Sequence, residues 1–176
     1  RDVWTASARN GLAGDFLMAN ILIICTANIC RSPVAAALLC ERLRRQGLVD
    51  WTVRSAGTWA MEPRGASRYS IDVARRDGLD LSRHRATMID EPQLANADLV
   101  LTMEVGHAEA LRAEFPRQAH KVYMLAEMIG HAYNIPDPYG GPYEEYERMY
   151  EGLTSVIDQG LDRIIELARE NANGRG

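Results

Sequence analysis

The chain has 176 residues, about the length of one ordinary domain, and 47% of them are hydrophobic, enough for a substantial core. The formal net charge of −4, without any basic run, argues against nucleic acid as a partner. No apolar stretch reaches the roughly 18 residues of a membrane-spanning helix, so we predict a soluble protein with no membrane partner.

The first 17 residues differ in character from the rest of the chain. They lack the basic start and apolar centre of a signal peptide, and Met18 is a candidate first residue. We therefore expect residues 1–17 to be disordered or an artefactual extension. Residues 18–176 show no internal repeat and no linker, which predicts one domain.

The cysteines indicate a compartment. There are three, an odd number, and two of them lie in one short loop: Cys25, Cys30 and Cys40. This pattern does not fit the disulfide framework of a secreted protein. We predict a reducing, cytoplasmic setting.

Short apolar runs alternate with amphipathic segments along the chain. The isoleucine-rich run at 20–25 is typical of a strand buried on both faces. Pro33 suits the first turn of the helix that follows, and Gly47 suits its end. In chain order we predict strands at 20–25, 49–58, 97–103 and 120–125, and helices at 32–47, 66–78, 104–115 and 143–172, the last of them after a loop at 135–142.

This alternation implies parallel strands joined by right-handed crossovers. We predict an α/β, single-domain, three-layer fold: a four-stranded parallel sheet with helices on both faces (flavodoxin-like). Such sheets bind ligands beyond the carboxyl ends of their strands. The first strand ends at Cys25, so the sequence CTANICRS (25–32) is expected to lie in the binding crevice.

The loop at 25–32 has the chemistry of an anion site. Backbone N–H groups at a helix N-terminus attract anions, and the guanidinium of Arg31 matches the geometry of a phosphate. The same positive environment favours a thiolate at Cys25, which would be a nucleophile directed at phosphorus. From spacing and context alone, an inert buried thiol and a solvated arginine fit the C-x5-R pattern about as well.

The sequence CTANICRSP resembles the phosphate-binding loop of the low-molecular-weight protein tyrosine phosphatases, which is C-x-G-N-x-C-R-S followed by proline. The resemblance extends over roughly residues 20–170. Further motifs occur in the family's order and at about its spacing: SAGT (55–58), LSRHRA (81–86), DLVLTM (98–103) and DPYGG (137–141).

The resemblance implies hydrolysis of phosphotyrosine through a cysteinyl-phosphate intermediate, with no metal and no cofactor. Cys25 would be the nucleophile, and Arg31 would bind the phosphate and its transition state. Asp137 would protonate the leaving phenolate and then activate the hydrolytic water. The alternative for Asp137 is a turn residue, because Asp-Pro before Tyr-Gly-Gly is ordinary turn chemistry.

The resemblance also implies how the loop is supported. Asn28 would take a left-handed backbone conformation and hydrogen bond to Ser32, Ser55 and His84. A plain surface position is the alternative for His84. Cys30 would form a reversible disulfide with the nucleophile and protect it from over-oxidation, or would simply pack under the loop.

Substrate contacts are expected from the loop and from two crevice walls. A packing role is the alternative for the tryptophan among them. The expected substrate-binding residues are Thr26, Ala27, Asn28, Ile29, Cys30 and Ser32 in the loop, and Tyr139, Met61 and Trp59 in the walls.

Several positions depart from the family's pattern. Ala27 replaces a glycine, which would cost about 1 kcal/mol if that position requires a positive φ. Met61 stands where an aromatic residue is frequent. Glu104 stands where aspartate is frequent, and it is given no role. Without metal-ligand spacing, no role is assigned to His107, His120 or His131.

Three other functions compete with this one. An arsenate reductase on the same fold would need further cysteines downstream, and none follows Cys40. A protein arginine phosphatase would carry threonine where this chain has Ile29. A non-catalytic phosphate-binding module would have no need of Asp137. We expect a phosphotyrosine-containing protein as the partner, and a monomer or weak homodimer.

Overall fold

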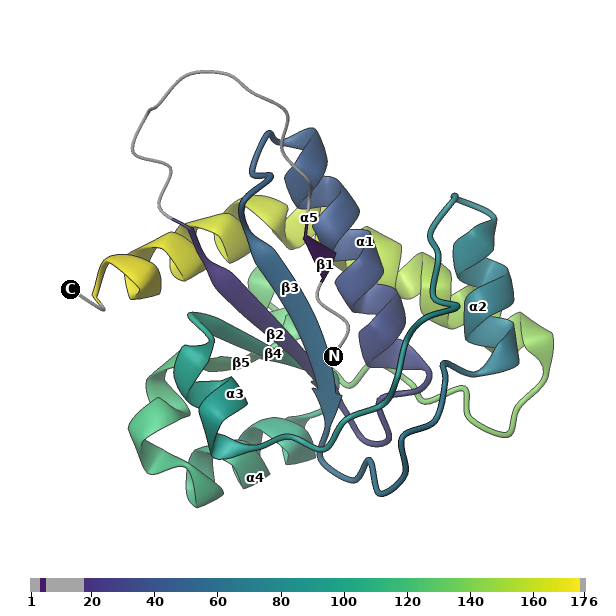
Figure 1. Ribbon diagram of the computed structural model, residues 1–176, viewed down its shortest axis with the longest axis horizontal. Helices are drawn as coiled ribbons and strands as arrows, with labels where there is room; N and C mark the ends of the chain where they lie inside the picture. Colours follow the sequence, from purple (N-terminus) through teal and green to yellow (C-terminus); the bar gives the residue numbers. More distant parts are fainter. Residues whose placement is uncertain (1–3, 6–17, 175–176) are drawn as a thin grey trace.

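A central sheet organises the molecule (Figure 1). The structure, a computed structural model, describes residues 4–5 and 18–174. The strands lie in the order β1-β3-β2-β4-β5, and β2, β3, β4 and β5 are parallel, which confirms the predicted four-stranded parallel sheet. The strands are β1 (Trp4–Thr5), β2 (Asn20–Cys25), β3 (Thr52–Gly57), β4 (Leu99–Thr102) and β5 (Val122–Met124).

The edge strand β1 was not predicted. It pairs antiparallel with Thr52 and Val53 of β3. It falls within the segment 1–17, for which we expected no regular structure, and the rest of that segment lies outside the described residues. The division of the chain at residue 18 stays a prediction.

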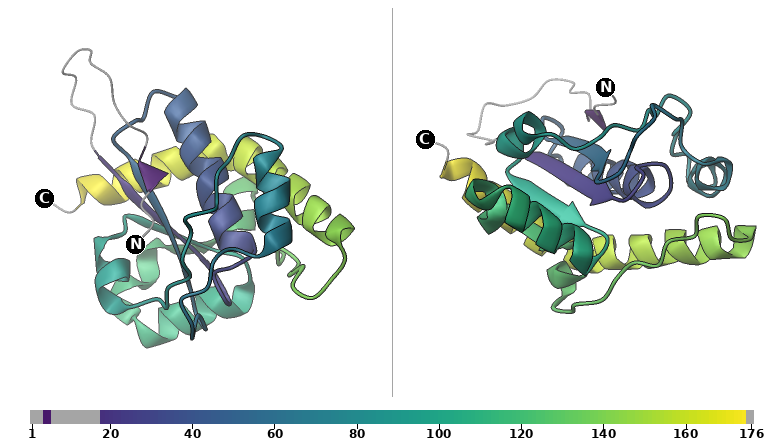
Figure 2. Two further views of the ribbon diagram at one scale, coloured as in Figure 1. Left: turned by 45° about the vertical axis from the view of Figure 1, so that its right-hand side comes forward. Right: turned by 90° about the horizontal axis from the view of Figure 1, so that it is seen from below.

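Helices cover both faces of the sheet, as predicted (Figure 2). The longest, α5, has 31 residues and runs across the back of the sheet in Figure 1. Within residues 4–5 and 18–174, none of the helices has both the length and the apolar character needed to cross a membrane. The α-helices are α1 (Arg31–Arg45), α2 (Arg68–Arg75), α3 (Glu91–Asn96), α4 (Val105–Glu114) and α5 (Tyr143–Asn173), and Pro116–Lys121 and Leu125–Ile129 form 3-10 helices.

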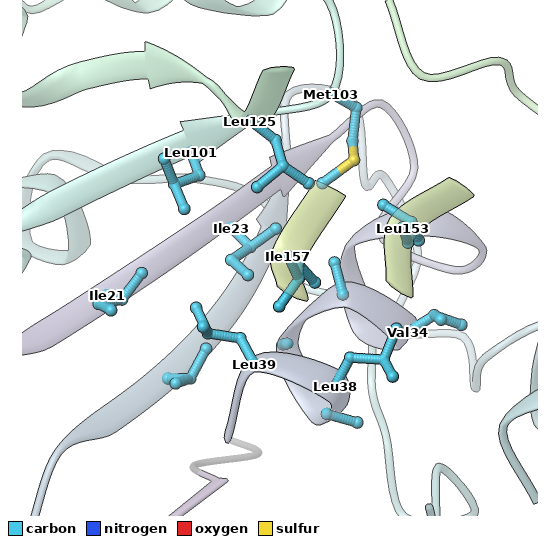
Figure 3. Close-up of a cluster of buried hydrophobic side chains, with 14 of the residues drawn as sticks. Ile21, Ile23, Val34, Leu38, Leu39, Leu101, Met103, Leu125, Leu153 and Ile157 are labelled. Atoms are coloured by element: carbon cyan, nitrogen blue, oxygen red, sulfur yellow. The ribbon is translucent and has the colours of Figure 1, made fainter. Parts of the chain in front are cut away.

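Alternating side chains of β2 separate the core into two clusters, because successive residues of a strand point to opposite faces. Ile21 and Ile23 pack in the larger cluster, with residues of α1 and α5 (Figure 3). Leu22 and Ile24 pack in the smaller cluster, with residues of α3 and α4. Burial on both faces explains why this strand reads as a continuous apolar run.

Helix α3 was not predicted. Its six residues are too few to show a helical period in the sequence. Its start is nevertheless well defined, because the Asp90 carboxylate accepts from the Gln93 backbone N–H at 2.8 Å and the Gln93 side chain accepts from the Asp90 N–H at 3.1 Å. This reciprocal capping box is the signal that could have revealed the helix.

Gly57 brings the end of β3 against the loop that follows β2. A Cβ at this position would lie 2.4 Å from the carbonyl oxygen of Thr26, a distance that real side chains do not adopt. With glycine there, the N–H groups of Thr58 and Trp59 donate to the carbonyls of Cys25 and Thr26 at 3.0 and 2.8 Å. The segment that follows Gly57 therefore holds the loop in place through backbone hydrogen bonds.

Candidate active site

Cys25 is the last residue of β2, and its sulfur lies inside the curled loop that leads into α1. Its side chain is 2% exposed. The backbone N–H of Asn28 donates to Sγ at 3.3 Å, and the hydroxyl of Ser32 lies 3.0 Å from Sγ. Both groups can donate a hydrogen bond to a thiolate at this position.

Asn28 holds the loop in its curled form. It is fully buried and has a φ of +57°, which confirms the predicted left-handed conformation. Its amide nitrogen donates to the hydroxyls of Ser32 and Ser55, each at 2.8 Å. Its backbone oxygen lies 2.6 Å from His84 Nε2. The structure therefore contains the three expected contacts, and adds a fourth, from the Thr87 N–H to Oδ1 at 3.0 Å.

The alanine that replaces the family's glycine is not strained. Among the described residues, Asn28 is the only non-glycine residue with a positive φ, so Ala27 has an ordinary backbone conformation. The cost considered for Ala27 does not arise. Ile29, which follows Asn28, buries its side chain, and its carbonyl accepts from the Ser67 N–H at 2.8 Å.

Arg31 begins α1 and is the buried cation of the site, with 1% of its side chain exposed. Its Nη1 makes an ion pair with Glu104 and donates to the carbonyl of Ile135 at 2.9 Å. Its Nη2 donates to Asp137 Oδ2 at 2.8 Å and to Thr26 Oγ1 at 3.3 Å. Its Nε is buried with no partner in the described structure. One guanidinium thus joins the loop, the end of β4 and the segment before α5.

Asp137 is both a turn residue and a member of the site. Its Oδ1 accepts from the Tyr139 N–H at 3.1 Å, which is the turn chemistry considered for this position. Its Oδ2 faces Arg31, and the carboxyl group is 42% exposed. Substrate could therefore reach it from solvent.

Sequence reasoning gave no role to two residues of the site. Glu104 follows the carboxyl end of β4, and that position, at the ligand-binding edge of a parallel sheet, is the signal that could have revealed it. His107 lies on α4 with its Nε2 2.9 Å from Thr26 Oγ1. The spacing of the histidines gave no indication of a metal site, and nothing else in the sequence indicated a role for His107.

Cys30 lies beneath the loop, 3% exposed, with Sγ 3.4 Å from Ser67 Oγ and 3.8 Å from the Tyr146 hydroxyl. Burial raises the pKa of the Cys30 thiol, and burial also raises the pKa of Tyr146 to about 12. Both groups therefore keep their protons near neutral pH. Cys25, Cys30 and Cys40 are all free thiols.

The proposed crevice walls are exposed. Trp59 lies next to the loop, since its N–H bonds to Thr26, and its side chain is 68% exposed. Tyr139, 61% exposed, follows Asp137 by two residues. Met61 is 70% exposed. Their part in binding substrate stays a prediction.

Together these groups suit displacement at phosphorus. The site offers a sulfur nucleophile at the N-terminus of a helix, a fixed guanidinium and a carboxyl group that can exchange a proton with solvent. The helix terminus and the guanidinium both favour a bound anion.

Comparisons with known proteins agree with this geometry. The family model described as "Low molecular weight phosphotyrosine protein phosphatase" matches residues 20–172. The chain is 32% identical over 151 residues to a probable low molecular weight protein-tyrosine-phosphatase, EpsP, of Ralstonia nicotianae, covering 86% of this chain and 99% of that protein. It is 34% identical over 145 residues to a protein-arginine-phosphatase of Geobacillus stearothermophilus, covering 82% and 95%.

Solved structures give the same picture. A low molecular weight protein tyrosine phosphatase from T. tengcongensis superposes with a TM-score of 0.78 at 36% identity, covering 82% of this chain and 99% of that one. The arginine phosphatase YwlE from Geobacillus stearothermophilus superposes with a TM-score of 0.76 at 33% identity, covering 86% and 96%. One fold thus serves two kinds of phosphatase among these relatives.

The ion pair of Arg31 with Glu104 predicts a measurable loss of stability in Glu104→Gln. The buried guanidinium loses one of its two carboxylate partners. Because Glu104 is one-third exposed, we expect the free energy of unfolding to fall by about 1–2 kcal/mol, less than the roughly 3–5 kcal/mol for a fully buried pair. Urea denaturation measures this change.

Asp158→Asn is the matched control for that experiment, because it removes a carboxylate from the more exposed Arg42–Asp158 ion pair. It should change the free energy of unfolding by no more than about 1 kcal/mol. Equal decreases in the free energy of unfolding would show that the Arg31–Glu104 pair stabilises the protein no more than an exposed ion pair does.

Proposed function

Because this chain belongs to the low molecular weight phosphotyrosine protein phosphatase family, we propose that it hydrolyses phosphotyrosine in proteins through a cysteinyl-phosphate intermediate. The observation that carries the proposal is the convergence of three groups. The sulfur of Cys25 lies inside an amide-rich loop, and the guanidinium of Arg31 at the end of that loop bonds to the carboxyl group of Asp137 at 2.8 Å.

In the first step, the Cys25 thiolate attacks phosphorus. The S–P bond forms as the bond between phosphorus and the tyrosine oxygen breaks. Asp137, protonated at this point, gives its proton to the departing phenolate oxygen, so that tyrosine leaves as a neutral phenol. The products are the cysteinyl-phosphate and an ionised Asp137.

In the second step, a water molecule attacks phosphorus from the side that the phenol left. The Asp137 carboxylate takes a proton from this water as the O–P bond forms. The S–P bond breaks, inorganic phosphate leaves, and Cys25 returns to its thiolate form. One carboxyl group serves both steps because it ends the first step ionised.

Arg31 neutralises the phosphoryl oxygens in both steps. Its planar fork of N–H donors matches two of those oxygens, and their growing charge in the transition state strengthens the bonds. A bound phosphate dianion also competes with Asp137 for Nη2.

Phosphoarginine is the second candidate substrate, because relatives of both kinds match this chain at similar identity. We favour phosphotyrosine on the character of the site. Ile29 is apolar and 4% exposed, so its side chain offers no polar atom to the guanidinium of a phosphoarginine. Trp59 and Tyr139 expose aromatic surface on which a phenyl ring can stack.

Phosphate release from phosphotyrosine, phosphoarginine and phosphoserine peptides tests this assignment, in reductant and without added metal. We expect the fastest release from phosphotyrosine. Cys25→Ser should abolish it, and Asp137→Asn should lower kcat by roughly 10²–10⁴-fold, the usual loss for a missing acid–base group. Cys40→Ser, a change in the second half of α1, should retain the wild-type rate.

Two outcomes would contradict the proposal in different ways. Preference for the phosphoarginine peptide would establish the second candidate and leave the mechanism intact. Failure to release phosphate from any peptide, in folded protein that still binds inorganic phosphate, would favour the non-catalytic binding module.

We further propose a cytoplasmic location and a monomer or weak homodimer acting on phosphoprotein substrates, with neither nucleic acid nor membrane as a partner. The three free cysteines support a reducing compartment. The net charge of −4 offers little attraction for nucleic acid or for anionic lipid.

Cys30 is proposed to protect the nucleophile. A peroxide oxidises the Cys25 thiolate to a sulfenic acid, and the Cys30 sulfur then attacks that sulfur, forming a disulfide and releasing water. The peroxide accepts the two electrons that the two cysteines lose. Cys30 lies beneath the same loop and remains a thiol, unreactive itself, until its neighbour is oxidised.

This role predicts reversible inactivation by hydrogen peroxide. Wild-type activity should return after treatment with a thiol reductant, whereas most of the activity of Cys30→Ser should be lost permanently as Cys25 passes to the sulfinic acid. Cys40→Ser is the control and should recover like the wild type. Full recovery of Cys30→Ser would show that Cys30 only packs beneath the loop.

A further inference from the structure

His107 is a buried histidine at the wall of the site, on the first turns of α4, and it is 7% exposed. Its Nε2 lies 2.9 Å from the hydroxyl oxygen of Thr26, the residue that follows the nucleophile. Its other ring nitrogen, Nδ1, is buried with no hydrogen-bond partner in the described structure. The ring therefore has one polar contact, and that contact is directed at the catalytic loop.

The unpartnered Nδ1 indicates where the ring carries its proton. If the proton were on Nδ1, a buried N–H donor would be left without an acceptor, a situation that folded proteins rarely contain. If the ring were charged, the Nδ1–H would again lack an acceptor, and the protein would also bury a positive charge. Burial accordingly lowers the pKa of His107. The remaining form is neutral, with its proton on Nε2 and directed at Thr26.

With the proton on His107 Nε2, the hydrogen bonds of the Thr26 hydroxyl can be assigned. A hydroxyl oxygen has two lone pairs and one hydrogen. One lone pair accepts from Arg31 Nη2 at 3.3 Å, and the other accepts from His107 Nε2 at 2.9 Å. The hydroxyl hydrogen is then left to donate to a group in the crevice, which in the reaction proposed above is an oxygen of the phosphoryl group.

The contact with Thr26 also matters for Arg31. Nη2 is shared between Thr26 and Asp137, and Asp137 changes its protonation in each step of the proposed reaction. If Asp137 were the only acceptor for Nη2, that bond would weaken whenever the carboxyl group is protonated. Thr26, fixed by His107, gives Nη2 an acceptor that does not change.

We propose that His107 is a positioning residue, which fixes the Thr26 hydroxyl by donating from Nε2 and so holds Arg31 in one plane while Asp137 exchanges its proton. This inference rests on the proposed phosphatase function and adds to it a residue from α4. It assigns no contact between His107 and the substrate itself.

The tautomer is the first test, and it can be read whether or not the enzyme is active on any peptide. Nitrogen NMR of protein labelled with ¹⁵N in its histidine rings distinguishes a protonated from an unprotonated ring nitrogen, and His107→Gln identifies the signals. We expect a neutral His107 with its proton on Nε2 at pH 7. A proton on Nδ1, or a charged ring, would overturn the inference.

Kinetics on p-nitrophenyl phosphate provide the second test. His107→Leu should lower kcat roughly tenfold with little change in KM, because it removes one hydrogen bond that orients the transition state. His107→Gln should recover most of this loss, since its side-chain amide can donate in place of Nε2. His131→Leu, which changes an exposed histidine, is the matched control and should match the wild type.

The double variant Thr26→Val/His107→Leu completes the test. If His107 acts through Thr26, the double variant should be no slower than Thr26→Val alone. Losses that simply multiply, or a His107→Gln variant as slow as His107→Leu, would overturn the inference. An inactive wild-type protein would instead refute the proposed function, so the two failures are distinguishable.

Discussion

Burial of the Arg31 guanidinium is the constraint on which the rest of this structure depends. An arginine cannot lose its charge in a protein, so a side chain that is 1% exposed needs partners for its donors. The chain supplies them from distant segments: Glu104 after β4, and Ile135 and Asp137 before α5. The parallel sheet makes this possible, because the carboxyl ends of its strands meet at one edge.

The loop between β2 and α1 depends on a second set of contacts, made by backbone and amide groups. Asn28 accepts a left-handed conformation that most residues avoid, and its five hydrogen bonds compensate for that cost. Gly57 lets the end of β3 approach the loop closely enough to bond with it. The sulfur of Cys25 is thus surrounded before any ligand arrives, which is the preorganisation that charge stabilisation requires.

Features that depend only on residues close together in the sequence could be predicted. The apolar run of β2, the loop motif with Cys25 and Arg31, and the glycine at the end of α1 each have a local physical cause. Glu104 could not be assigned a role, since its importance arises from an arginine 73 residues away. His107 was missed for the same reason. The edge strand β1 has two residues and α3 has six, too few for either to show a periodic pattern.

The proposed mechanism transfers a phosphoryl group from tyrosine to one sulfur atom, that of Cys25. The most direct measurement is an acid quench of the reaction with a phosphotyrosine peptide within the first turnover, followed by mass spectrometry of the protein's peptic fragments. The proposed mechanism predicts one phosphate, attached to Cys25, in wild-type protein. Phosphate on another residue, or turnover with no phosphoenzyme, would contradict it.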